Sequence, residues 1–183
     1  MQRLVLACAT FSACGAGLLG PVVPASQQVE AAATSILDAA RKLATAPALT
    51  KDVIQDTLDV VLAVDASTSH AAVTFFSGAP RRGSRYARTV SLVDLRVPTP
   101  QNSLMKGPFL YVELRPDAGI GAEMLEAGLG RPDEVDVPEP NPRYVMTYRY
   151  ALRPSSLRYS IGPGTARPVV AFSIDRSGES RRR

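Results

Sequence analysis

The sequence predicts an α+β fold in which one small unit, a helix followed by a three- or four-stranded antiparallel meander, occurs twice in tandem. The second half carries the clearer signals. Apolar residues recur at helical spacing over 120–129, and strand-like runs follow over 144–150, 157–161 and 169–174. One such unit alone would bury little surface, whereas two side by side can share a larger core.

The first half repeats this order of elements. A helix is predicted over 49–58, where Thr50 can act as the N-cap. Strand-like runs then follow over 71–76, 89–97 and 109–114. The repeated order is the main basis for the tandem prediction.

The two predicted helices also align with each other without a gap, since Leu49 lies on Ile120 and Leu58 on Leu129. Ahead of them, an alanine-rich apolar stripe predicts a leading helix that packs on the domain or acts as a tether. The chain is therefore divided into a signal segment over 1–25, a leading helix and linker over 26–48, a first unit over 49–116, a second unit over 117–176 and a basic disordered tail over 177–183.

The first residues have the composition of an export signal. A positive charge at Arg3 precedes an uncharged apolar stretch, and a signal peptidase could cleave after Ala25. Alternatively, Cys14 lies in a lipobox-like sequence and would become a lipidated first residue. Both cysteines, Cys8 and Cys14, lie in this segment, so the mature domain has no disulfide framework. We expect a periplasmic or secreted protein, with an outer-membrane lipoprotein as the alternative.

The charge balance argues against a nucleic-acid-binding domain. The formal net charge is +4, and three of the positive charges lie in the terminal Arg181–Arg183. The rest of the chain is therefore close to neutral, and it shows no basic patch interleaved with aromatic residues.

The sequence also offers little catalytic chemistry. His70 is the one histidine, and no thiol nucleophile remains after export. The acidic stretch over 132–142 lacks the glycine spacing of a calcium loop. We therefore predict a non-enzyme without a metal site or a cofactor.

The end of the second predicted helix carries the motif Leu129-Gly130-Arg131-Pro132. With the order of helix and aromatic-rich meander, this motif resembles the β-lactamase inhibitor protein fold, which the small lipoproteins of the outer-membrane barrel-assembly machinery share. The first half has Leu58-Asp59-Val60-Val61 in its place, and the disulfides usual in the inhibitor family are absent. The resemblance implies a protein that binds other proteins through an exposed sheet face and loops.

Alternation along the strands separates a core face from an open face. The tyrosine row over 144–150 is assigned to the core, as are Val170, Phe172 and Ile174 of the last strand. The residues assigned to partner binding are, on the open face, Arg96, Phe109, Tyr111, Glu113, Arg149 and Arg158 and, on a basic loop, Arg81, Arg82, Arg85 and Tyr86.

Two functions remain open from these observations. The first is an exported envelope protein that binds and inhibits another protein, as an inhibitor or an immunity protein does. It would act by covering the cleft of a secreted or envelope enzyme. The alternative is a structural outer-membrane assembly-type lipoprotein attached to the membrane by lipid at Cys14.

Overall fold

The computed structural model describes residues 24–102, 105–137, 143 and 145–176. Residues 1–23 of the predicted export signal, including Cys14, and the predicted basic tail over 177–183 lie outside these residues. The described helices are α1 (Ala25–Thr45), α2 (Lys51–Leu58) and α3 (Ala122–Leu129), with a short 3-10 helix η1 (Pro116–Ala118) ahead of α3.

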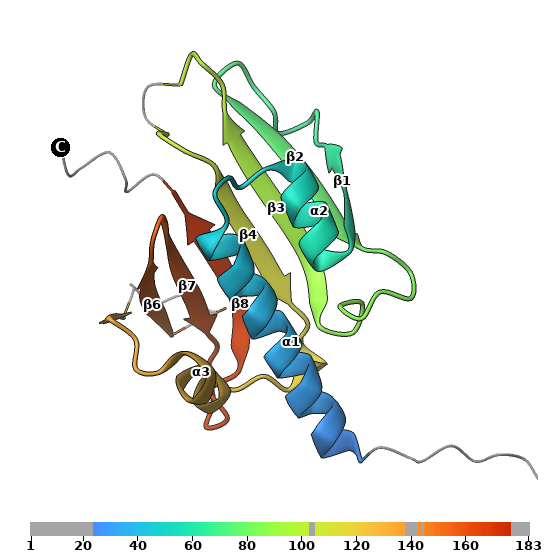
Figure 1. Ribbon diagram of the computed structural model, residues 1–183, viewed down its shortest axis with the longest axis vertical. Coiled ribbons are helices and arrows are strands. Elements are labelled where there is room, and N and C mark those ends of the chain that lie inside the picture. The colour runs from blue at the N-terminus through green and yellow to red at the C-terminus, as the bar shows by residue number, and fades with distance from the viewer. Residues whose placement is uncertain (1–23, 103–104, 138–142, 144, 177–183) are drawn as a thin grey trace, which may run out of the picture.

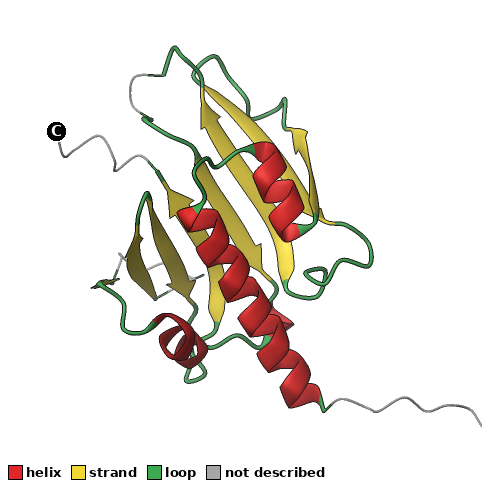
Figure 2. Ribbon diagram, in the orientation of Figure 1, coloured by secondary structure: helices red, strands yellow, loops and turns green. Residues whose placement is uncertain are grey.

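The strands form one antiparallel sheet in the order β1-β2-β3-β4-β8-β7-β6-β5 (Figures 1 and 2). Strand β4, the last strand of the first half of the chain, pairs with β8, the last strand of the second half, at the centre of the sheet. The predicted α+β class is confirmed. The strand bounds are β1 (Val60–Val64), β2 (Val73–Pro80), β3 (Val90–Pro98), β4 (Phe109–Leu114), β5 (Glu134–Asp136), β6 (Met146–Leu152), β7 (Ser155–Ile161) and β8 (Val169–Asp175).

All three described helices cover the same face of this sheet. Figure 1 shows α1 running across the middle, with α2 on the side of β1 to β3 and α3 near β6 and β7. Buried residues from the three helices and from the strands belong to one continuous apolar core. The opposite face of the sheet is covered by no described helix.

The leading helix α1 is the centrepiece of the core. Its predicted stripe is buried at Ala33, Ile36, Ala40 and Leu43, while Val29 is half-buried. Alanines along the stripe let the helix backbone approach the sheet closely, so a stripe of small side chains still excludes water. Of the two roles expected for this helix, packing on the domain is the one observed.

Helix α2 begins and ends as its sequence dictates. Thr50 is the N-cap, since its hydroxyl accepts a hydrogen bond from the Val53 N–H at 3.3 Å. The helix ends at Asp59, which adopts a left-handed conformation with φ of 49°. This one residue reverses the chain, and β1 begins at Val60.

Two strand features differ from the prediction. Strand β2 does not end before Gly78 but runs through it to Pro80, because Gly78 pairs with both β1 and β3. On β8, Val169 is buried and Val170 is only half-buried, because the register of β7 with β8 shifts between Ser160 and Ile161.

The predicted tyrosine row lies in the core, as expected for its described members. Tyr148 and Tyr150 on β6 are buried under the helices, and Met146 is partly buried against the same core, whereas Tyr144 lies outside the described residues. Tyr159 on the neighbouring strand β7 is buried as well. The Tyr148 hydroxyl donates to a carboxylate oxygen of Glu126 at 3.0 Å, and the Tyr150 hydroxyl donates to the Gly130 carbonyl oxygen at 3.3 Å. These hydrogen bonds tie α3 to the sheet.

This burial predicts a loss of stability at high pH. Burial is the largest cause that raises the pKa of Tyr150 to about 12, and the nearby carboxylates of Glu126 and Asp133 add to it. The pKa of an exposed tyrosine is about 10. The unfolded chain loses the proton first. The free energy of unfolding should therefore hold up to pH ~10 and then decrease toward pH ~12.

Urea unfolding at a series of pH values checks this. In the Tyr150→Phe variant the decrease between these pH values should be shallower than in the wild type. A wild-type free energy of unfolding that stays constant from pH ~10 to pH ~12 would contradict the expected effect.

Candidate functional site on the open face of the sheet

The face of the sheet opposite the helices, called the open face below, carries rows of side chains fixed by strand register. In one row, Phe75 on β2 pairs with Arg96 on β3, which pairs with Phe109 on β4, which pairs with Asp175 on β8. The row continues through Ser156 on β7 to Ala151 on β6. Paired residues in an antiparallel sheet point to the same face. The predicted site residues Arg96 and Phe109 are thus direct neighbours.

A second row runs beside the first and crosses all eight described strands. Tyr111 on β4 lies at its centre, next to Asp94 on β3 and Ser173 on β8. A third row contains Glu113, which pairs with Ala171. The second row consists of Ala63, Ser77, Asp94, Tyr111, Ser173, Arg158, Arg149 and Glu134.

Arg96 is held between two aromatic rings. Its guanidinium carbon lies 5.5 Å from the centre of the Phe75 ring and 5.3 Å from that of Phe109. Its Nη2 also lies 3.1 Å from Oδ2 of Asp94. Cation–π contacts on two sides and an ion pair leave this side chain little rotamer freedom. All three aromatic and arginine side chains are half-buried and still reach solvent.

Two arginines face each other further along the second row. Arg149 on β6 pairs directly with Arg158 on β7, an arrangement of like charges that is unfavourable by itself. Arg149 Nη1 lies 2.7 Å from Oε2 of Glu134, which offsets its charge. Arg158 is exposed and forms none of the ion pairs found among the described residues. Its guanidinium group is therefore open to solvent on the open face.

The basic loop between β2 and β3 lies apart from the open face. Arg81 pairs with Asp59 at the end of α2, at 3.1 Å, and Arg82 is exposed. Arg85 stacks on the ring of Tyr86 at 4.9 Å. The structure therefore divides the predicted site residues into two groups.

The expectation that Tyr86 lies exposed in this loop is wrong. Its side chain is 2% exposed and belongs to the core, and its carbonyl oxygen accepts from the N–H groups of Thr89 and Val90. Burial of a large aromatic ring in the core is more favourable than its exposure to solvent in a loop. Arginines surround Tyr86 in sequence, but its ring is not available to a partner.

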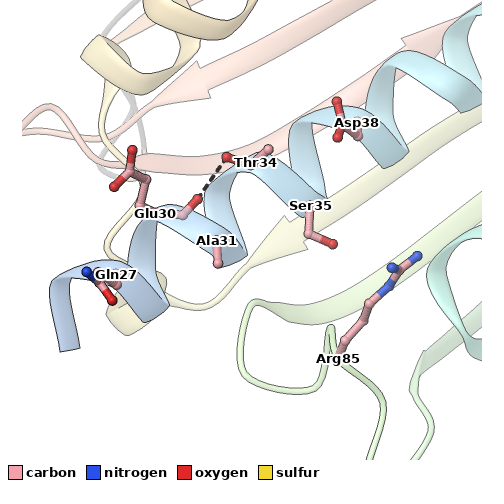
Figure 3. Close-up of a pocket in the computed structure, with 7 residues that line it drawn as sticks. All are labelled: Gln27, Glu30, Ala31, Thr34, Ser35, Asp38 and Arg85. Atoms are coloured by element: carbon pink, nitrogen blue, oxygen red, sulfur yellow. Dashed lines mark hydrogen bonds between the residues drawn. The ribbon is translucent and has the colours of Figure 1, made fainter. Parts of the chain in front are cut away.

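A hollow of about 580 Å³ lies on the helix side of the molecule, between the first half of α1 and Arg85 (Figure 3). Its wall includes the carboxylates of Glu30 and Asp38. The Thr34 hydroxyl donates to the Glu30 carbonyl oxygen at 2.9 Å, so it is already engaged. The hollow is lined by Gln27, Glu30, Ala31, Thr34, Ser35, Asp38 and Arg85.

The one histidine of the chain, His70, lies at the surface. It is exposed in the turn before β2, where its Nδ1 accepts from the Ala72 N–H at 3.2 Å and its ring lies 5.9 Å from that of Phe75. In the acidic stretch, an oxygen of Asp133 accepts from the Ala151 N–H at 2.6 Å. Within the described ranges, no three histidine, cysteine or acidic side chains gather as a metal site would require.

Sequence analysis did not single out Phe75, although it completes the arrangement around Arg96. Phe75 and Phe76 are adjacent, so alternation places one of them on each face. Only the register of β2 against β3, which sets Phe75 beside Arg96, shows which phenylalanine faces the arginine.

The sequence matches no protein-family model and no curated protein. Among solved structures, the chain is similar to a DUF4309 family protein (YjgB) from Bacillus subtilis, at 11% identity and a TM-score of 0.45, over 81% of this chain and 98% of that one. No helix in the described part of the chain is both long and apolar enough to span a membrane.

Proposed function

We propose that this chain is an exported envelope protein that binds another protein through the open face of its sheet and inhibits that protein by covering it. The observation that carries the proposal is the arginine held between two phenylalanine rings on a sheet face that no described helix covers. Aromatic side chains and arginine are the residues most enriched among those that dominate binding energy at protein interfaces.

The charge pattern of the open face favours a protein over a nucleic acid as the partner. Among the described residues of this face, carboxylates outnumber guanidinium groups, and a polyanion would be repelled by them. A protein surface can present both signs of charge in a matching pattern. The acidic residues are Asp94, Glu113, Glu134, Asp136 and Asp175, and the basic ones are Arg96, Arg149 and Arg158.

The proposal includes a tandem origin for this face, with a first unit over 49–116 and a second over 117–176. In support, α2 and α3 are each followed by four strands, and the bounds Lys51–Leu58 and Ala122–Leu129 match residue for residue under the alignment of the two helices. The last strands of the two units pair with each other, which joins two small faces into one broad surface suited to covering a cleft.

Affinity capture tests the binding function. The purified protein, immobilised and exposed to envelope extract, should retain one protein in stoichiometric amount. The Arg158→Glu variant should retain far less of it, because the change replaces an exposed positive side chain of the open face with a negative one. Arg153→Glu, the same change at an exposed arginine in the turn between β6 and β7, serves as the matched control.

The captured protein also tests inhibition. If it is an enzyme, addition of the wild-type chain in excess should reduce its activity, and Arg158→Glu should reduce it less. Retention of no protein, or equal retention by wild type and Arg158→Glu, would argue against binding by this face. Labelling with a clickable fatty acid separates a free inhibitor from the lipid-tethered alternative, because only the latter is labelled at Cys14.

A further inference from the structure

The arginines of the basic loop have no role on the open face. Arg82, Arg85 and Arg88 recur every three residues and are all exposed. Arg115 lies beside them, because its Nε donates to the Ala87 carbonyl oxygen at 3.0 Å, and it is exposed as well. Among the described residues, none of these four arginines takes part in an ion pair. Arg82, Arg85, Arg88 and Arg115 are called the arginine cluster below.

Hydrogen bonds and one buried ring fix the shape of this loop. The Ser84 N–H donates to the Arg81 carbonyl oxygen and the Ala87 N–H donates to that of Ser84, both at 3.0 Å. Gly83 has a φ of 86°, in the region that favours glycine. The ring of Tyr86 is buried in the core and anchors the loop. The loop is therefore folded into consecutive turns, which hold its arginines within a short stretch of surface.

The arginine cluster lies toward the end of the molecule where α1 begins. Arg85 lines the same hollow as Gln27 in the first turn of α1. Close to Arg115 in the chain, a Cβ atom at Gly119 would lie 3.0 Å from Cγ1 of Val29 on α1. Figure 1 shows the loop between β2 and β3 and the first half of α1 toward the same end of the fold. The chain therefore enters the domain at the end that carries the cluster.

The nearest carboxylates of α1 face away from the cluster. Glu30 and Asp38 line the hollow with Arg85, but they also line a second hollow of about 270 Å³ with Gly128 of α3. Figure 3 shows both acidic side chains pointing away from Arg85. Asp117 on η1 is exposed and offsets one of the four charges of the cluster. An excess of positive charge remains at this end of the molecule.

We propose that the arginine cluster binds the phosphate groups of an anionic lipid bilayer, as a second surface separate from the open face. Guanidinium groups bind phosphate through paired, charge-assisted hydrogen bonds. Clusters of basic side chains are attracted to the negative surface potential of anionic lipids. Lipid attachment at Cys14, the alternative left open by the sequence, would join the bilayer to the domain at this same end.

The composition of the loop favours a bilayer over a protein or a nucleic acid. Between residues 81 and 89 no apolar or aromatic side chain is exposed, since Tyr86 is buried. A protein interface draws much of its affinity from buried aromatic anchors, and a nucleic-acid single strand stacks its bases on aromatic rings. A bilayer surface needs neither, because its headgroups present many phosphates to the exposed guanidinium groups.

Sedimentation of the full chain with lipid vesicles tests the proposal. The vesicles contain equal parts of phosphatidylglycerol and phosphatidylcholine, in about 0.1 M salt, where charges more than about 10 Å apart are largely screened. Reversal of three charges of the cluster should lower the partition coefficient onto these vesicles by about 100-fold or more. This variant carries Arg82→Glu, Arg85→Glu and Arg88→Glu. The uncharged stretch over 4–20 is common to all variants, so it contributes to each partition coefficient alike.

A matched control reverses three exposed arginines elsewhere on the domain, and it should lower the partition coefficient by less than about threefold. It carries Arg131→Glu, Arg153→Glu and Arg158→Glu. A third variant replaces the same three cluster arginines by lysine, which keeps their charge, and it should bind within about tenfold of the wild type. Because the control includes Arg158 of the open face, vesicle binding is measured separately from binding by that face.

Several outcomes would overturn the proposal. Equal losses in the two glutamate variants would show that the net charge of the chain, and not the cluster, determines binding. A loss in the lysine variant as large as in the cluster glutamate variant would show that the charge of the loop is not what binds. Wild-type binding no tighter to the mixed vesicles than to pure phosphatidylcholine would exclude an anionic surface. Loss of the captured partner protein by the cluster variant, without vesicle binding by the wild type, would assign the arginines to a protein interface instead.

Discussion

Replacement of Gly78 by alanine should lower the free energy of unfolding by about 2 to 4 kcal/mol. Gly78 lies on β2 and pairs with both Leu62 and Val93. A Cβ atom at this position would lie 1.9 Å from the Val61 carbonyl oxygen. The obstacle is backbone, which cannot rotate aside, so the substitution must separate β1 from β2 or distort both.

Urea unfolding followed by circular dichroism measures this effect. Gly128→Ala in α3 is the matched control, since its Cβ would meet only a methyl group of Leu37 at 3.1 Å. Alanine also favours a helix over glycine by about 1 kcal/mol. The control should therefore change stability by no more than about 1 kcal/mol in either direction. A Gly78→Ala protein as stable as the wild type would contradict the close approach of β1 to β2.

Replacement of Phe109 by alanine should weaken partner binding by about 2 kcal/mol or more, a loss of roughly 30-fold in affinity. The change removes a half-buried apolar ring from the open face and one of the two rings that hold Arg96. Part of the loss comes from the arginine, whose rotamers would then have to be ordered at binding.

Isothermal titration calorimetry with the captured partner gives this affinity. Phe76→Ala is the matched control, because Phe76 is also half-buried but packs against the core on the helix side of the same sheet. Phe76→Ala should lower stability yet leave affinity nearly unchanged. Equal losses of affinity in the two variants would indicate that binding depends on the stability of the sheet and not on its open face.

The faces of the strands were predictable where alternation is strict. In β4, Phe109 and Tyr111 reach solvent on the open face, to which the sequence analysis assigns them, while Leu110, Val112 and Leu114 are buried on the other face. A period of two fixes both faces at once in such a strand. This is why the main residues of the candidate site could be identified from sequence.

Features that depend on long-range pairing or on an unusual conformation were not predictable. Strand β1 follows α2 after the single residue Asp59, which adopts a left-handed conformation. No glycine or proline marks this turn in the sequence, so the start of β1 could not be predicted. The burial of Val169 depends on a register shift between β7 and β8. The pairing of β4 with β8, which makes the open face continuous, joins strands from opposite halves of the chain.

Hydroxyl-radical footprinting of the complex tests the proposed binding face most directly, because it reports the exposure of individual side chains. Addition of the captured partner should protect Phe75, Phe109 and Tyr111 on the open face and leave Met124, half-buried on α3, as reactive as in the free protein. Protection of Met124 with unchanged reactivity of the three aromatic residues would show that the partner binds the helix side, and the proposed site would be wrong.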